Sequence, residues 1–93
     1  MAHDYYVARD LSARIALLDD DAKVELDRCL EDLMANPEPD GITRIAQPPY
    51  FPYRPGAIAH RCGRFSFGYT LTNQGMVLEI YSIYPLPDLP AVP

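Results

Sequence analysis

Residues 41–78 carry four arginines, one histidine and three tyrosines but no acidic residue. The arginines are Arg44, Arg54, Arg61 and Arg64, and the histidine is His60. Guanidinium groups bind phosphate or carboxylate oxygens through paired hydrogen bonds and stay charged at physiological pH. The segment therefore has the residue types needed to bind a polyanion or an acidic partner, with His60 as a candidate for proton transfer.

The charge of the chain is divided unevenly between its two parts. Residues 1–40 contain eleven acidic and four basic residues, a balance of −7, whereas residues 41–93 contain four arginines and two acids, a balance of +2. The sum is the net charge of −5. This asymmetry favours an anionic partner for the second part. The alternative is a solvated acidic helical surface beside a sheet, since Asp and Glu are rare in strands for packing reasons.

Aromatic residues alternate with prolines over residues 48–55, within this segment. Tyr50, Phe51 and Tyr53 lie among Pro48, Pro49, Pro52 and Pro55. Proline restricts the backbone, so exposed aromatic rings there could stack on bases or on a partner with little loss of entropy. The same rings could instead close one end of a small core. The candidate RNA- or partner-binding residues are Arg44, Tyr50, Tyr53 and Arg54.

Two cysteines, Cys29 and Cys62, are separated by 33 positions. A zinc site needs about four ligands, and His3 and His60 have no paired spacing, so we expect free thiols with no metal or cofactor. The opening residues lack the basic flank and apolar run of a signal peptide, and no segment has the length of a membrane span. These features predict a cytoplasmic protein.

The first part of the chain has the pattern of one strand and two helices. Residues 4–11 alternate apolar and polar side chains and predict a strand. Ser12 is a candidate N-cap for a short helix over residues 13–18. A longer helix is predicted over residues 22–35, because apolar residues recur there at helical spacing, and Asn36-Pro37 ends it.

The second part has the pattern of a three-stranded antiparallel meander, with strands over residues 57–60, 65–71 and 76–83. Prolines make residues 37–56 a connector with at most a short edge strand at 42–45. With the first strand added, the fold class is α+β: a four-stranded sheet with the helical hairpin on one face. We expect one domain over residues 1–84 and an extended proline-rich tail over 85–93. The predicted core consists of Leu26, Leu30, Leu33, Phe67, Tyr69, Leu78 and Ile80.

Over about residues 4–85 the chain resembles the RelE/ParE superfamily of small toxins from bacterial toxin–antitoxin modules. The residues that carry the resemblance are Tyr5-Tyr6-Val7-Ala8, Leu30-Glu31-Asp32-Leu33-Met34-Ala35-Asn36-Pro37, Cys62-Gly63-Arg64-Phe65-Ser66-Phe67-Gly68-Tyr69 and Val77-Leu78-Glu79-Ile80-Tyr81-Ser82-Ile83-Tyr84. The helix end "L-x-x-L-x-x-N-P" and the strand "G-R-[aromatic]-x-[apolar]-x-Y" are the most specific of these patterns.

The resemblance implies an antitoxin as partner and one of two activities. RelE-like members cleave messenger RNA on the ribosome, and ParE-like members poison DNA gyrase. It places basic residues at Arg61 and Arg64 and a catalytic residue at Tyr84, with His60 as a further catalytic candidate. The chain departs from the family at Ser66, where a second basic residue is expected, and at Pro85. A non-catalytic protein-binding module of the same fold, which could form a homodimer, is therefore the alternative to an endoribonuclease.

Overall fold

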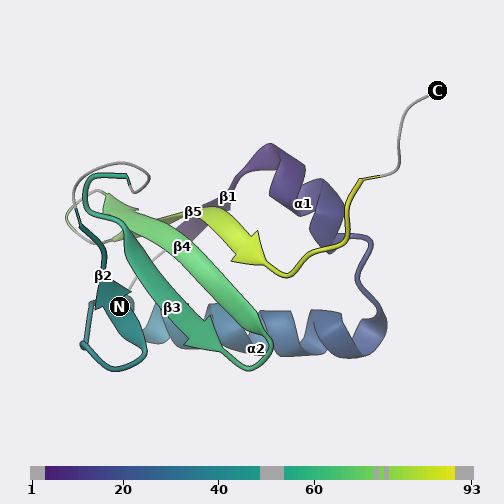
Figure 1. The fold of residues 1–93 in the computed structure, drawn as a ribbon, viewed down its shortest axis with the longest axis horizontal. Helices are drawn as coiled ribbons and strands as arrows, with labels where there is room; N and C mark the ends of the chain where they lie inside the picture. The colour runs from purple at the N-terminus through teal and green to yellow at the C-terminus, as the bar shows by residue number, and fades with distance from the viewer. Residues whose placement is uncertain (1–3, 49–53, 73, 75, 90–93) are drawn as a thin grey trace.

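The structure, a computed structural model, describes residues 4–48, 54–72, 74 and 76–89. Two helices and one five-stranded sheet make up this part of the chain (Figure 1). The elements in order are β1 (Asp4–Val7), α1 (Arg9–Ile15), α2 (Asp20–Ala35), β2 (Arg44–Ala46), β3 (Ile58–Cys62), β4 (Phe65–Thr72) and β5 (Val77–Tyr84). The α+β class predicted from the sequence is confirmed.

The strands lie in the order β1-β5-β4-β3-β2. Strands β3, β4 and β5 form the predicted antiparallel meander, while β1 pairs with β5 in parallel. The prediction of four strands was wrong, because the short segment β2 pairs with β3 and extends the sheet to five. Its position, one to two residues later than the expected edge strand, lets Arg44 lie opposite His60.

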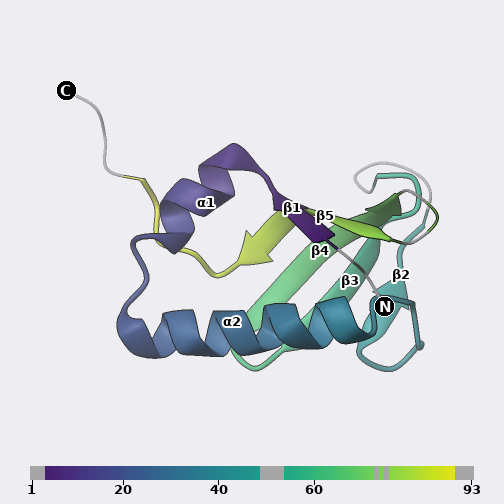
Figure 2. The ribbon, with the colours of Figure 1, turned by 180° about the vertical axis from the view of Figure 1, so that it is seen from behind.

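Helix α2 crosses one face of the sheet, which we call the inner face (Figures 1 and 2). Asp19 begins the helix, because its carboxylate accepts a hydrogen bond of 2.8 Å from the backbone N–H of Ala22. Leucines at helical spacing then face the sheet, and Leu33 is fully buried. All seven predicted core residues are buried, together with Leu11, Ala22, Cys29, Ala57, Ile58, Phe65, Ile83 and Leu86.

Helix α1 begins earlier than predicted. It starts at Arg9, with Ala8 at the N-cap position, and not after Ser12. The expected strand over residues 4–11 is correspondingly shorter, since its pairing with β5 ends at Val7 opposite Ile80. Because the helix begins at Arg9, Leu11 lies in the core. Burial of this apolar side chain stabilises the fold more than a hydroxyl cap at Ser12 would.

The described part of the tail, residues 85–89, packs against α1. Leu86 is buried in the core. Arg14 holds the backbone beside it, donating from Nε to the Pro87 carbonyl at 2.9 Å and from an Nη atom to the Leu86 carbonyl at 3.0 Å. The start of the tail therefore belongs to the packed structure.

Cys29 on α2 and Cys62 at the end of β3 form a disulfide, with their Cα atoms 5.8 Å apart. The expectation of free thiols was wrong. The reason is geometric: the helix lies over the sheet so that positions 33 residues apart in sequence become neighbours.

In the described part of the chain, no helix is long and apolar enough to cross a membrane.

Candidate binding site on the outer face of the sheet

The outer face of the sheet, opposite α2, carries a row of three polar side chains on neighbouring strands. Arg61 on β3 pairs with Ser66 on β4, and Ser66 pairs with Tyr84 on β5. All three are exposed. Strand alternation produces this row, because each of them lies next to residues whose side chains fill the core on the other face.

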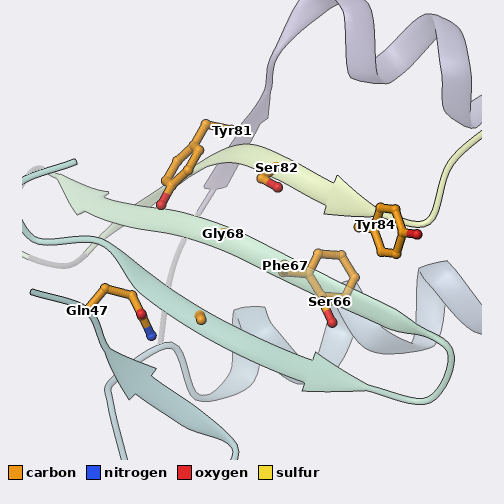
Figure 3. Close-up of a pocket in the computed structure, with 8 residues that line it drawn as sticks. Gln47, Ser66, Phe67, Gly68, Tyr81, Ser82 and Tyr84 are labelled. Carbon is orange, nitrogen blue, oxygen red and sulfur yellow. The ribbon is translucent and has the colours of Figure 1, made fainter. Parts of the chain in front are cut away.

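This face is hollowed between β2 and β5. One hollow of about 250 Å³ lies over β4 and β5, where Gln47, Ala59 and Ser66 adjoin Tyr81, Ser82 and Tyr84 (Figure 3). A second hollow of about 520 Å³ continues toward β2 and is bordered by Ile42, Ile45 and Arg61. The two share Gln47, Ala59 and Ser66, so together they form one shallow groove across the sheet.

Gly68 sets the floor of the first hollow. A Cβ atom at this position would lie 3.1 Å from the ring of Tyr81, which is tighter than ordinary van der Waals contact. The register shifts next to Gly68, since Gly68 pairs with Ser82 while Tyr69 pairs with Ile80. Tyr81 is the extra residue of this bulge, which re-aims its ring so that its hydroxyl points over β4 (Figure 3).

Arg54 extends the basic character of the groove to its far end. Its guanidinium carbon lies 4.3 Å from the centre of the Tyr81 ring, a cation–π contact. Arg54 and Arg61 thus lie near opposite ends of the groove. No described residue that lines either hollow is acidic, so the arginines supply the charge at the groove although the whole chain is negatively charged.

Two of the other predicted site residues, His60 and Arg44, face the inner side. His60 is buried against Phe67, with ring centres 6.2 Å apart. Burial lowers the pKa of His60 below its ordinary value, so the imidazole is neutral at pH 7. Arg44 is also buried, and one of its Nη atoms donates to the Asp32 carboxylate at 2.7 Å.

A turn that begins at Asp40 holds Arg44 in this place. The Asp40 carboxylate accepts hydrogen bonds from the backbone N–H groups of Arg44, Ile42 and Thr43 at 2.8 to 3.0 Å. These bonds, that of Arg44 first, hold the pKa of Asp40 well below its usual range. The guanidinium of Arg44 is therefore engaged within the fold and lies away from the groove.

Arg64 lies at the tip of the β3–β4 hairpin and is joined to α2. Its backbone N–H donates to one oxygen of Glu25 at 2.7 Å, and its Nε donates to the other at 3.2 Å. The backbone bond, followed by the side-chain bond and the charge of Arg64, lowers the pKa of Glu25. Arg64 is about half exposed, so this contact fixes the hairpin on the helix without fully occupying the side chain.

The structure therefore brings together Arg61, Tyr84 and, at the far end of the groove, Arg54. It places His60 and Arg44 on the opposite face and Arg64 at the hairpin tip, while Tyr50 and Tyr53 lie outside the described residues. Among the groove residues not singled out from the sequence are Gln47, Gly68, Tyr81 and Ser82. Strand alternation alone could have placed Ser82 beside Tyr84, but no local signal shows the bulge that brings in Tyr81.

Comparison with protein-family models and with curated protein sequences gives no significant match. Among solved structures, a chain of the toxin–antitoxin complex RelBE2 from Mycobacterium tuberculosis is similar, with a TM-score of 0.67. The similarity covers 89% of this chain and 96% of that chain, at 11% sequence identity. The helices and the sheet described above are thus arranged as in that chain, and the two share one fold.

Proposed function

We propose that this protein is the toxin-like component of a bacterial toxin–antitoxin module and that it binds RNA in the groove on the outer face of the sheet. The observation that carries the proposal is the row of Arg61, Ser66 and Tyr84 across three strands, in a groove where none of the described lining residues is acidic. The RelE-like fold supports the toxin-like role, and an antitoxin is the expected protein partner.

The groove offers separate contacts for phosphates and bases. Arg54 and Arg61 can bind backbone phosphates, since a guanidinium presents a fork of donors that matches phosphate oxygens. Tyr84 is 71% exposed and can stack on a base, as aromatic side chains do in proteins that bind single strands. The short side chains of Ala59, Gly68 and Ser82 leave the floor low enough for a strand to lie across it.

Within this proposal the reaction is cleavage of messenger RNA on the ribosome. The 2′-hydroxyl must lose a proton, negative charge develops on the scissile phosphate, and the leaving oxygen must gain a proton. Arg61 is assigned to the phosphate charge and Tyr84 to a proton transfer, with the Ser66 hydroxyl between them as a hydrogen-bond donor. No proton transfer is assigned to His60, because its side chain is buried near Asp32 and Phe67, although the residue borders the second hollow.

A specific observation favours a second candidate, a non-catalytic protein-binding module. Apolar side chains border the groove at β2, where Ile42 is 80% and Ile45 is 47% exposed. Such residues suit a protein partner better than RNA. The position of a second arginine is taken by Ser66, which removes one source of transition-state stabilisation. Inhibition of DNA gyrase would be one form of this protein-binding role.

Induced expression without the antitoxin distinguishes the candidates. An endoribonuclease should arrest growth and leave cleaved messages. Arg61→Ala or Tyr84→Phe should reduce cleavage by about 10²–10³-fold, the order expected for losing a charge-stabilising group or a proton-transfer group. Arg9→Ala, which removes an exposed arginine on α1, is the matched control and should cleave normally.

The outcomes separate clearly. Growth arrest without RNA cleavage would favour the protein-binding candidate, and cleavage that survives the Arg61→Ala, Tyr84→Phe double variant would show that the site is elsewhere. Arg64→Ala is informative as well, because cleavage lost in this variant alone would move the site to the hairpin tip.

A further inference from the structure

Three side chains of metal-ligating type meet on the inner face, where the end of α2 lies over β3. Asp32, His60 and Cys62 present ligand atoms that all lie within 4.8 Å of one another. Cys29, one turn before Asp32 on α2, contributes a second sulfur through its bond to Cys62. The cluster lies on the α2 side of the sheet, away from Arg61, Ser66 and Tyr84, although His60 also borders the second hollow.

The hydrogen bonds of His60 define the state of its ring. Nδ1 lies 3.2 Å from the carbonyl oxygen of Thr43, which can only accept, so Nδ1 carries the proton and Nε2 carries a lone pair. Nε2 is buried and has no hydrogen-bond partner, although the Asp32 carboxylate oxygen lies 3.4 Å away. The Arg44 guanidinium donates to this same oxygen of Asp32, but Nε2 of His60 is left without a partner, which is unfavourable for a buried polar atom.

We propose that the reduced protein binds one thiophilic divalent metal ion, Zn²⁺ or one of similar chemistry, through Cys29, Cys62, His60 and Asp32. A thiol reductant first converts the disulfide to two thiols and is itself oxidised to a disulfide. The metal then replaces the two thiol protons, which are released to solvent. The Cys29–Cys62 disulfide and the bound metal exclude each other, because both use the same two sulfur atoms.

The geometry suits zinc. Nitrogen and oxygen ligands about 2.0–2.1 Å from a tetrahedral zinc ion lie about 3.4 Å apart, and the observed distance from His60 Nε2 to Asp32 is 3.4 Å. The bond from Nδ1–H to the Thr43 carbonyl is the kind of supporting contact that fixes the tautomer of metal-binding histidines.

The site also holds charges of both signs. The two thiolates and the Asp32 carboxylate would face the divalent ion, and the guanidinium of Arg44, which pairs with Asp32 and Asp40, offsets part of their negative charge. Arg44 donates at 2.7 Å to the Asp32 oxygen that faces His60, and a carboxylate oxygen has a second lone pair with which it can bind the metal. In a reducing compartment, where disulfides do not persist, the metal would take over the link between α2 and β3.

Cobalt is a suitable probe, because Co²⁺ takes the place of zinc and absorbs visibly when thiolates bind it. Protein reduced with a phosphine is titrated with Co²⁺ without oxygen, and Zn²⁺ is then added. We expect one bound ion per chain, a thiolate-to-cobalt absorption band and its loss when zinc displaces cobalt. The oxidised protein should show no band, since its sulfurs are bonded to each other.

Variants test the ligands. Cys62→Ser and His60→Gln should weaken Co²⁺ binding by more than the about 10–100-fold typical of losing a supporting residue. Glu31→Gln removes an exposed carboxylate next to Asp32 and should bind as the wild type does. Equal binding by His60→Gln and Glu31→Gln would overturn the assignment of His60 and with it the proposal.

Circular dichroism covers the case in which reduction unfolds the chain. Zn²⁺ added to such a sample should restore the helical signal of the native protein, because metal binding then provides folding free energy. A reduced wild type that gains neither the cobalt band nor helical signal from metal, whether folded or unfolded beforehand, overturns the proposal.

Discussion

Reduction of the Cys29–Cys62 disulfide is expected to destabilise the protein strongly when no metal is present. The bond joins residues 33 positions apart and so restricts a long loop of the unfolded chain. The chain-entropy relation for such a loop gives about 3.7 kcal/mol at 25 °C. For a domain of this size the same change corresponds to a fall in Tm of about 15–30 °C.

Urea unfolding of oxidised and reduced protein, both in a metal chelator, measures this difference directly. The chelator prevents bound zinc from stabilising the reduced form. The Cys29→Ala, Cys62→Ala double variant is the control, since reductant should leave its free energy of unfolding unchanged. A difference below about 1 kcal/mol between the two wild-type forms, with mass spectrometry confirming reduction, would refute the entropic reasoning.

Three further predictions concern the core, the buried histidine and the groove. Leu30→Ala should lower the free energy of unfolding by about 2–5 kcal/mol. Val24→Ala, on the exposed side of α2, should change it by less than about 0.5 kcal/mol. If urea unfolding shows similar losses of stability for the two variants, the helix register is wrong. The pKa of His60 is lowered from 6.5 in the folded state, so the unfolded chain binds this proton more tightly. The free energy of unfolding of the oxidised protein should therefore fall as the pH drops below 6.5 and level off below the folded pKa. A His60→Gln variant with the same pH profile would show that His60 does not cause the pH dependence. Charge reversal of Arg54 and Arg61 should weaken RNA binding and reduce the slope of its salt dependence by about one per lost phosphate contact. Unchanged binding in a filter or fluorescence assay would show that RNA does not bind in the groove.

Features with a local cause could be predicted from the sequence. The spacing of Leu26, Leu30 and Leu33 gives helix α2 its buried side, and Asn36-Pro37 ends it. Strand alternation also held the signal for His60, which shares the parity of the buried Ile58 and therefore faces inward.

Features that depend on distant segments could not be predicted in this way. The parallel pairing of β1 with β5 joins the two ends of the domain, and nothing within residues 4–7 specifies that partner. The Cys29–Cys62 bond likewise depends on how α2 lies over β3. The groove needed both the sheet order and the bulge at Tyr81 before Arg61, Ser66 and Tyr84 could be recognised as one row.

The position of β5 between β1 and β4 has a consequence for the time at which the sheet is completed during synthesis. Among the described strands, β1 has no neighbour except β5, and β5 is the last strand to leave the ribosome. A nascent chain that lacks β5 cannot join its first strand to the sheet, and it also lacks Tyr81, Ser82 and Tyr84. The groove therefore forms only after β5 has been synthesised, so the row of Arg61, Ser66 and Tyr84 cannot exist on a shorter nascent chain.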